Sequence, residues 1–404
     1  MKWALFKFED VALPEKGAIV SGPFGSNISS RFFVEEGVPV IRGNNLSFGQ
    51  RRFIDDGFVY LTEEKAHEFR NCQAVADDLV FTAAGTIGQV GIIPQQTRFD
   101  RYIVSNKQLR FRCDRTKVNP LFLFFWFTMD EMRQHIINKN TGCSIPLINL
   151  GILRGLPVPV PPLEVQDRIV DSLSAYDDLI ENNRRRMALL EETARQLYRE
   201  WFVRLRFPGH EHTLITNGVP EGWERRTLGD LAEITMGQSP ESRHYNEDGE
   251  GLPFHQGVTD FGDRFVTHRI YSTALNRLAE PGDILCSVRA PVGRLNVTLD
   301  KIVIGRGLAA LRSETGHQSL LLQQLRAHFF KEDLIGGGAI FASVTKKEFS
   351  AQELLDPSER LKQSFEEVTR LCDEQLRVLH LQNQKLRTAR DLLLPRLMTG
   401  EIAV

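Results

Sequence analysis

The chain has few cysteines and no long apolar run, and each shortage excludes a class of protein. Its 404 residues contain five scattered cysteines without Cys-x-x-Cys spacing: Cys72, Cys113, Cys143, Cys286 and Cys372. Such a set fits neither a disulfide framework nor a zinc site, and it indicates a reducing compartment. The longest apolar run, residues 121–127, is too short to cross a bilayer, and the N-terminus lacks the apolar stretch of a signal peptide. We therefore expect a cytoplasmic protein without a metal site.

Recognisable catalytic motifs are also missing. The sequence has no Asn/Asp-Pro-Pro-Tyr signature of an amino-methyltransferase, no Gly-x-x-x-x-Gly-Lys-Ser/Thr phosphate loop and no His-Glu-x-x-His. The turns at residues 85–88 and 305–307 are rich in glycine, but neither precedes a convincing helix, so we interpret them as backbone-shaping turns. We expect that this chain catalyses nothing itself.

The overall charge limits what kind of partner the chain can bind. A formal net charge of −2, with 42% hydrophobic and 25% charged residues, is typical of an ordinary globular protein of two or three domains. It argues against a generally basic coat for nucleic acid. Any surface that faces DNA has to be local, with the acidic residues placed elsewhere.

A long helix is predicted from Leu163 to Val203. Apolar residues follow one another at alternating steps of four and three from Ile169 to Trp201, with acids and arginines between them. This is the heptad spacing of a helix that lies along a partner helix in a coiled coil. About forty residues at about 1.5 Å each make a rod of roughly 60 Å. The alternative is a single long core helix, whereas a coiled coil requires a partner helix.

The partner is a second helix at Pro357–Leu397, which a shift of 196 residues superimposes on the first. Each helix carries one asparagine at an inward position, which costs stability but fixes the register of a coiled coil. The predicted interface of the helix pair consists of Ile169, Tyr176, Ile180, Asn183, Met187, Leu190, Leu197, Phe365, Leu376, Leu379, Asn383, Leu386 and Leu393. Pro395 is expected to kink or stop the second helix near its end.

The segments that precede the two helices repeat as well. Residues 77–88 align without gaps on residues 282–293, and residues 37–43 resemble residues 251–257. Valine-, isoleucine- and phenylalanine-rich runs between glycine turns predict strands at residues 38–41, 79–83, 90–93, 284–287, 295–299 and 309–312. One helix is expected in each segment, at Leu121–Ile137 and Ser319–Phe330, and the run Gly336–Gly338 is expected to be a loop.

The predicted fold is therefore α+β, with two similar mixed α/β domains joined by two long antiparallel coiled-coil helices in a pseudo-twofold tandem repeat. The expected segments are a first domain at residues 1–155, a central helix at 156–206, a second domain at 207–355 and a C-terminal helix at 356–404. The stretch Arg204–Gly222, rich in proline and glycine, is the clearest linker.

Polar loops with arginine, asparagine and glutamine occur in both repeats. Arginine pairs with guanine, and asparagine or glutamine with adenine, in the major groove, while lysine and serine mostly contact phosphates. The alternative for each residue is an ordinary solvated loop. The candidate DNA-binding residues are Ser26, Asn27, Arg31, Arg42, Asn44, Asn45, Arg51, Thr86 and Lys107 in the first half, and Gln238, Ser239, Arg243, Tyr245, Gln256, Arg289, Arg294, Arg306 and Lys346 in the second.

Several motifs resemble those of one family, the DNA-specificity subunits of type I restriction-modification systems. They include residues 21–26 (SGPFGS), 38–46 (VPVIRGNNL), 236–240 (MGQSP), 281–293 (PGDILCSVRAPVG), 304–310 (IGRGLAA) and 390–402 (RDLLLPRLMTGEI). The approach to the first helix, residues 156–166, resembles the corresponding part of the family. There are two departures: Asp77 stands where the family has glycine, and residues 355–358 lack the double proline.

The resemblance implies a mechanism. Each domain would read one half of a split, asymmetric target in double-stranded DNA, and the helix pair would set the gap between the halves. Two methyltransferase subunits, which use S-adenosylmethionine, would dock on the chain. Restriction subunits, which use ATP and magnesium, would complete the complex. No cofactor would be bound by this chain.

Two rival functions remain open from the residues. An unrecognised nuclease or methyltransferase site would be revealed by S-adenosylmethionine binding or DNA cleavage by the purified chain alone. A pure protein scaffold would be indicated if neither domain bound DNA at any salt concentration while a protein partner bound both.

Overall fold

The computed structural model describes residues 3–49, 51–329 and 343–404. The chain forms two compact units, and both contain parts of the two long helices. Unit 1 consists of residues 1–181 together with 383–404, and unit 2 consists of residues 182–382. Phe330 and the expected loop Gly336–Gly338 lie outside the described residues.

Both long helices are present. Helix α5 spans Leu163–Tyr198 and continues as a π-helical turn at Arg199–Val203, and α10 spans Glu359–Met398. Pro395 lies inside α10, which runs on for three further residues, so the proline does not stop the helix. Its missing N–H removes one hydrogen bond from the last turns of the helix, that to the Asp391 carbonyl.

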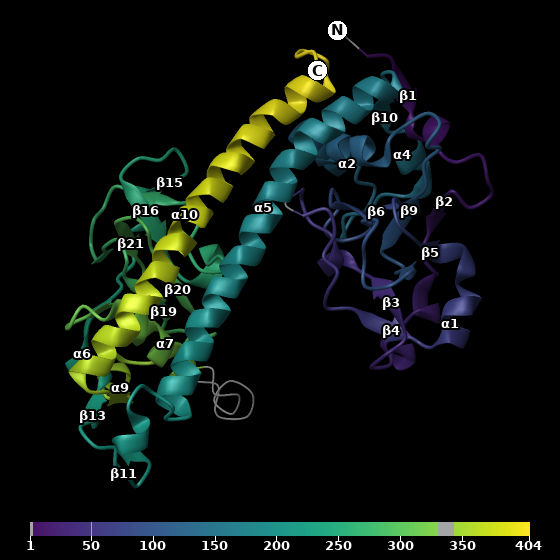
Figure 1. Ribbon diagram of the computed structural model, residues 1–404. Coiled ribbons are helices and arrows are strands. Elements are labelled where there is room, and N and C mark those ends of the chain that lie inside the picture. The colour runs from purple at the N-terminus through teal and green to yellow at the C-terminus, as the bar shows by residue number, and fades with distance from the viewer. Residues whose placement is uncertain (1–2, 50, 330–342) are drawn as a thin grey trace. The chain divides into compact units, whose positions relative to one another are not determined.

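Within each unit the two helices pack against each other in opposite directions (Figure 1). In unit 1 the buried Asn383 amide donates to the Ile180 carbonyl, and Arg390 pairs with Asp177 at 2.7 Å. In unit 2, Leu376 packs with Met187 and Leu190, and Phe365 packs with Trp201. Every residue of the predicted helix-pair interface is buried or half-buried.

The sheets of unit 1 have the strand orders β2-β9-β6-β7 and β4-β3-β8-β5, and a separate ladder joins β1 and β10. The β3–β8 pair is parallel and the other pairs are antiparallel. The elements are β1 (Leu5–Lys7), β2 (Ile19–Ser21), β3 (Val38–Ile41), β4 (Val59–Leu61), α1 (Glu63–Glu68), β5 (Gln73–Ala74), β6 (Leu79–Thr82), β7 (Val90–Ile92), β8 (Tyr102–Val104), β9 (Gln108–Phe111), α2 (Pro120–Thr128), α3 (Asp130–Asn138), α4 (Leu150–Arg154) and β10 (Pro157–Pro159).

Unit 2 repeats this plan, with strand orders β14-β22-β19-β20 and β15-β17-β16-β21-β18, the ladder β13-β23 and an extra hairpin β11-β12. The β16–β21 pair is again parallel. The elements are β11 (Ile215–Thr216), β12 (Val219–Pro220), β13 (Glu224–Thr227), α6 (Leu228–Leu231), β14 (Ala232–Met236), β15 (Tyr245–Asn246), β16 (Leu252–His255), β17 (Tyr271–Ser272), β18 (Leu278–Ala279), β19 (Ile284–Ser287), β20 (Leu295–Val297), β21 (Ile302–Ile304), β22 (Leu308–Ser313), α7 (Gln318–Phe329), α9 (Lys346–Ser350) and β23 (Glu353–Asp356).

A buried aspartate organises the turn before the central strand of each unit. Asp78 accepts two hydrogen bonds from Arg112, both at 2.8 Å, and Asp283 accepts two from Arg312 at 2.8 and 3.0 Å. The preceding residue is left-handed in both units, with φ of 68° at Asp77 and 92° at Gly282. Because aspartate tolerates this conformation better than most residues, its replacement of glycine leaves the turn intact.

The predicted α+β class and all six predicted strands are confirmed, with ends that differ by one or two residues. The single helix predicted at Leu121–Ile137 is wrong, because α2 and α3 are separate helices. Met129 between them has extended backbone, with φ of −59° and ψ of 139°. Asp130 and Glu131 then begin α3, where negative charge is favourable.

The core of unit 1 includes residues from both ends of the chain: Phe8 packs in one cluster with Ile169, Leu394 and Met398. The four-segment division expected from the sequence stays a prediction. Among the described residues, no helix is long and apolar enough to cross a membrane.

Candidate nucleic-acid interface

In unit 1 the loops that carry most of the candidate residues meet at one edge of the sheets. They follow the ends of β2, β3, β6 and β8. The Gly22 N–H donates to the Gln108 carbonyl, the Ser105 N–H to the Ile41 carbonyl, and the Ala83 N–H to the Lys107 carbonyl. We call residues 22–27, 42–47, 83–88 and 105–107 the first loop edge.

Unit 2 has an equivalent edge with the same backbone hydrogen bonds. The Gly237 N–H donates to the Leu308 carbonyl, the Gly305 N–H to the His255 carbonyl, and the Val288 N–H to the Gly307 carbonyl. We call residues 237–239, 256–257, 288–294 and 305–307 the second loop edge. The frame is therefore built from main-chain contacts, which leaves the side chains free to differ.

Two glycines make this frame possible. A Cβ atom on Gly22 would lie 1.9 Å from the Ser105 carbonyl oxygen, and one on Gly237 would lie 2.2 Å from the Gly305 carbonyl oxygen. Since backbone cannot move aside as a side chain can, each position requires glycine. The two contacts also make Gly22 equivalent to Gly237, and Ser105 equivalent to Gly305.

Charge is distributed differently at the edges than elsewhere in the units. Lys107, Arg289, Arg294 and Arg306 are exposed, and within the described ranges none of them pairs with an acidic side chain. Arg312 and Arg390, which lie away from the edges, do have such partners. Unpaired cations are available to phosphates, which supply most of the affinity for DNA.

The candidates of the first half fall into two groups. Ser26, Asn27, Asn44, Thr86 and Lys107 are exposed on the first loop edge, and Arg42 is half-buried there. Arg31 lies beyond the edge in a short 3-10 helix, with its guanidinium 4.5 Å from the centre of the Phe32 ring. Arg51 is exposed in the following loop. Whether these side chains contact DNA stays a prediction.

The structure corrects the prediction that Asn45 contacts DNA. Its side chain is completely buried, and its amide is fully used inside the loop. The Oδ1 atom accepts the Arg42 N–H at 2.9 Å, and Nδ2 donates to the carbonyls of Ile54 and Asp56. A completely buried amide that donates both of its N–H groups inside the loop is not accessible to a base, so Asn45 instead shapes the loop that presents Arg42 and Asn44.

In unit 2 the candidates Gln238, Ser239, Gln256, Arg289, Arg294 and Arg306 all lie on the second loop edge. The Ser239 hydroxyl donates to Gln256 Oε1 at 2.8 Å and accepts the Arg306 N–H at 3.2 Å. Gly305 lies against the same glutamine. One serine therefore holds three loops together and orients the Gln256 amide.

Two other candidates of unit 2 have partners within their own loop. The Tyr245 hydroxyl donates to the Pro240 carbonyl at 2.8 Å, and its ring stacks on Phe254 at 4.7 Å between centroids. Arg243 pairs with Glu241 at 3.0 Å. Tyr245 therefore fixes the loop after the second edge, while Arg243 remains exposed with a neighbouring acid that reduces its local positive charge.

A buried histidine lies directly below the second loop edge. His255, at the end of β16, is completely buried, and its Nε2 is 3.0 Å from Nδ1 of His268. The other ring nitrogen of His268, Nε2, is 3.0 Å from Asp300. Burial, followed by the charge of His268, lowers the pKa of His255 to about 4. His255 is therefore neutral at pH 7 and supports the backbone of Gln256 without adding charge to the edge.

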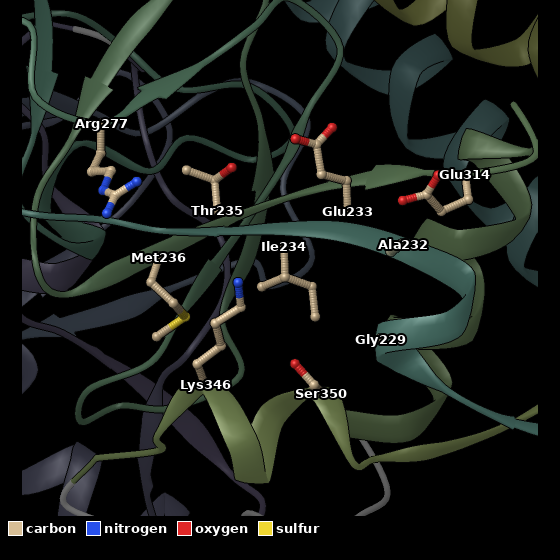
Figure 2. Close-up of a pocket in the computed structure, with 10 residues that line it drawn as sticks. All are labelled: Gly229, Ala232, Glu233, Ile234, Thr235, Met236, Arg277, Glu314, Lys346 and Ser350. Atoms are coloured by element: carbon tan, nitrogen blue, oxygen red, sulfur yellow. The ribbon is translucent and has the colours of Figure 1, made fainter.

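Lys346 lies away from the edge, on α9 beside β14. It lines a hollow of about 460 Å³ together with Arg277, Glu233 and Glu314. Figure 2 shows the Lys346 ammonium directed toward β14, with the two carboxylates farther along the strand. Because charges of both signs line the hollow, it offers no selective site for an anion. A phosphate contact by Lys346 stays a prediction.

The sequence reasoning missed Phe24, which is the most exposed large hydrophobic residue of the described chain at 84%. It lies on the first loop edge beside Ser26 and Asn27. Phe24 lies within the motif SGPFGS, but it was not among the candidate DNA-binding residues. The available signal was its position between Pro23 and Gly25, which does not match a strand or helix.

Within the described residues, no group of three or more histidine, cysteine, aspartate or glutamate side chains could hold a metal ion. The five cysteines are free thiols. A duplicated frame with one loop edge per copy defines a class of proteins with two related recognition units.

Comparison with known proteins identifies the family. Residues 3–192 match the family described as type I restriction modification DNA specificity domain. A chain of Methanocaldococcus jannaschii assigned as the MjaX type I restriction enzyme specificity subunit is 28% identical over 85% of this chain and 83% of its own length. The MjaIX specificity subunit of the same organism is 21% identical over 100% of this chain and 94% of its own.

A solved structure has the same fold. The S subunit of a type I restriction-modification system from M. genitalium superimposes with a TM-score of 0.58 at 14% identity, covering 98% of this chain and 96% of that one. The chain belongs to the family of DNA-specificity subunits of type I restriction-modification systems. Members of this family provide recognition and are not catalytic.

Proposed function

We propose that the chain reads a two-part, asymmetric DNA target, with one half-site for each loop edge and the helix pair as the spacer. The observation that carries the proposal is the presence of two edges with one backbone frame and different side chains. Arg42 of the first edge occupies the position of Gln256 in the second, and Phe24 occupies the position of Ser239. Different side chains on one frame favour different bases in the two half-sites.

The loop edges have the composition of a DNA-reading surface. Exposed cations without acidic partners would contact phosphates and position the duplex, while Asn44, Gln238 and Gln256 would reach base edges. Half-sites one helical turn apart are roughly 34 Å from each other, which a helix of about forty residues can span. Because these cations would contact phosphates, the affinity of the chain for DNA would depend on salt.

The outer faces of the long helices are the proposed docking surface for two methyltransferase subunits. Leu179 and Leu392 are exposed on the helix segments of unit 1, and Leu189 and Leu371 on those of unit 2. Exposed leucines on otherwise polar helix faces favour a protein partner. The partners would bring S-adenosylmethionine for adenine methylation, and restriction subunits would bring ATP and magnesium. The free thiols are in keeping with work in the cytoplasm.

The test is modified-base sequencing of DNA from cells that express this chain with its methyltransferase partner. The expected result is a two-part motif with methylated adenine in each half. Exchange of residues 1–156 for the corresponding domain of another family member should change one half only. The proposal fails if no two-part motif appears, or if the exchange changes both halves.

A further inference from the structure

One arginine in each unit extends from the sheet region to the long helices. In unit 2, Arg264 donates to Asp373 of α10 at 2.6 Å. In unit 1, Nε of Arg52 lies 3.5 Å from Asp177 of α5. Neither arginine lies on a loop edge.

The two arginines occupy equivalent positions in the sheets. The Arg52 carbonyl accepts the N–H of Ile92 at 2.9 Å, and the Arg264 carbonyl accepts the N–H of Val297 at 3.0 Å. These donors are the last residues of β7 and β20, and a phenylalanine follows each arginine in the chain. The two sheets therefore present the same backbone position to their helices.

The two aspartates are equivalent as well. The shift of 196 residues that superimposes α5 and α10 places Asp177 on Asp373. In each unit the sheet arginine thus binds the corresponding aspartate of the helix that follows its own domain. The arginines are equivalent by their place in the sheets and the aspartates by their place in the helices, so Arg52–Asp177 and Arg264–Asp373 are equivalent pairs.

In unit 2 both long helices hold the arginine. The Arg264 side chain is only 5% exposed, and a second acid, Glu191 of α5, lies 3.6 Å from it. Glu191 also pairs with Arg326 at 3.2 Å, and Asp373 also accepts the Ser319 hydroxyl at 2.7 Å. A planar guanidinium held between acids on two helices fixes direction as well as distance.

The contact in unit 1 uses the same elements more loosely. Arg52 is 25% exposed and lies 3.8 Å from a second acid, Asp178. Asp177 is shared with Arg390 of α10, at 2.7 Å. Both helices again take part, but here the aspartate forms the bridge between them.

We infer that Arg52 and Arg264 are positioning residues that set the orientation of each loop edge on the helix pair, and through it the gap length that the chain accepts. The inference rests on the proposed function. A change of one base pair in the gap moves a half-site by about 3.4 Å and turns it by about 35° around the duplex. An edge held at one angle fits one gap, whereas an edge that can swivel fits several.

The test measures adenine methylation by the chain with its methyltransferase partner on DNAs with the natural gap and with gaps one base pair shorter or longer. Arg264→Met and Arg52→Met remove the charged guanidinium but keep an unbranched apolar stem. We expect methylation at the altered gaps, relative to the natural gap, to rise about tenfold for Arg264→Met and less for Arg52→Met. Arg264→Lys should be intermediate, because it keeps the charge without the planar geometry.

Matched controls exist in the same units. Arg312→Met and Arg112→Met break arginine–aspartate pairs that lie within the sheets and touch neither long helix. They should lower the thermal stability without changing the gap preference. Binding to DNA with a single half-site should stay within about twofold for all four variants, because the loop edges are untouched.

The outcomes separate the two proposals. If the wild-type chain directs methylation to no two-part motif, the proposed function fails, and this inference fails with it. If a motif is found but the Arg264 variant keeps the wild-type gap preference, only the positioning role is overturned. The same holds if the Arg312 control relaxes the gap as much as the Arg264 variant does, since loss of stability alone would then explain both.

Discussion

The two loop edges share their backbone and differ in their side chains. Gly22 packs against the Ser105 carbonyl, and Gly237 packs against the equivalent carbonyl of Gly305. Equivalent backbone hydrogen bonds join the loops of each edge. On this frame, unit 1 places Phe24, Ile41 and Arg42 where unit 2 places Ser239, His255 and Gln256. A duplicated domain can therefore acquire a second specificity by replacing side chains while these main-chain contacts are retained.

The attachment to the helices differs in strength. Arg264 is nearly buried between two acids, whereas Arg52 is more exposed and farther from its acids. Unit 2 should therefore be held more rigidly than unit 1.

The largest effect is expected from a charge placed between the helices. Leu376→Asp in unit 2 and Ile180→Asp in unit 1 each put an unpaired carboxylate at a buried position, which costs about 4 kcal/mol. Each should lower the stability of its own unit in urea unfolding and abolish methylation at every target. Leu189→Asp, at an exposed position of α5, the helix that also carries Ile180, is the control and should unfold like the wild type. Unchanged methylation by Leu376→Asp would contradict the spacer role.

The next largest effect is expected from the contacts that Arg264 and Arg52 make with the long helices, and its size should differ between the two units. Arg264→Met leaves Asp373 without its cation and Glu191 with Arg326 alone, and it should cost about 3 kcal/mol, because the Arg264–Asp373 pair is largely buried. Arg52→Met should cost about 1 kcal/mol, because its pair is longer and more exposed. Equal losses in urea unfolding would show that the geometric difference between the units has no energetic consequence.

Because of its buried His255, the stability of unit 2 should depend on pH in a way that unit 1, with Ile41 at the equivalent position, does not share. The pKa of His255 is lowered to about 4 from 6.5, so the unfolded chain binds a proton that the folded chain excludes between these values. Stability should rise with pH through this window and fall by about 2 kcal/mol from pH 7 to pH 5. His255→Ile introduces the residue of the equivalent position, Ile41, and should flatten this part of the profile. An unaltered slope in the variant would assign the pH dependence to other groups.

The smallest effect on stability is expected at Phe24. Because its side chain is almost fully exposed, Phe24→Ala should change the free energy of unfolding by less than about 0.5 kcal/mol. Its loss should nevertheless weaken binding to the first half-site about tenfold, since exposed aromatic side chains on recognition surfaces contribute large contacts. Ser239→Ala is the counterpart in unit 2. It removes two hydrogen bonds, should cost about 1 kcal/mol and should affect only the second half-site.

Periodic features were predictable from the sequence. The alternating spacing from Ile169 to Trp201 predicted the helix pair, and valine- and isoleucine-rich runs between glycines predicted the central strands, because both patterns depend on neighbours in the sequence. The break at Met129 was missed, since nothing in its composition opposes a helix.

Contacts between distant residues were not predictable. Asn45 was predicted to contact DNA because asparagine pairs with adenine and lies here in a polar loop, but its amide donates to the carbonyls of Ile54 and Asp56, where the chain returns. Arg52 and Arg264 were not identified as equivalent, because residues far along the chain supply their partners. The resemblance to the family predicted the repeated fold, whereas the contacts of individual side chains became known only from the packing.

Unit 1 is built from two stretches of chain that the whole of unit 2 separates. Leu394, Leu397 and Met398 complete the core around Phe8 and Ile169, yet the ribosome makes them only after residue 382. The domain that is synthesised first therefore waits for a segment that is synthesised after its neighbour. Closing a loop of about 200 residues adds little to the free energy but slows folding, so unit 2 should reach its native state first during translation.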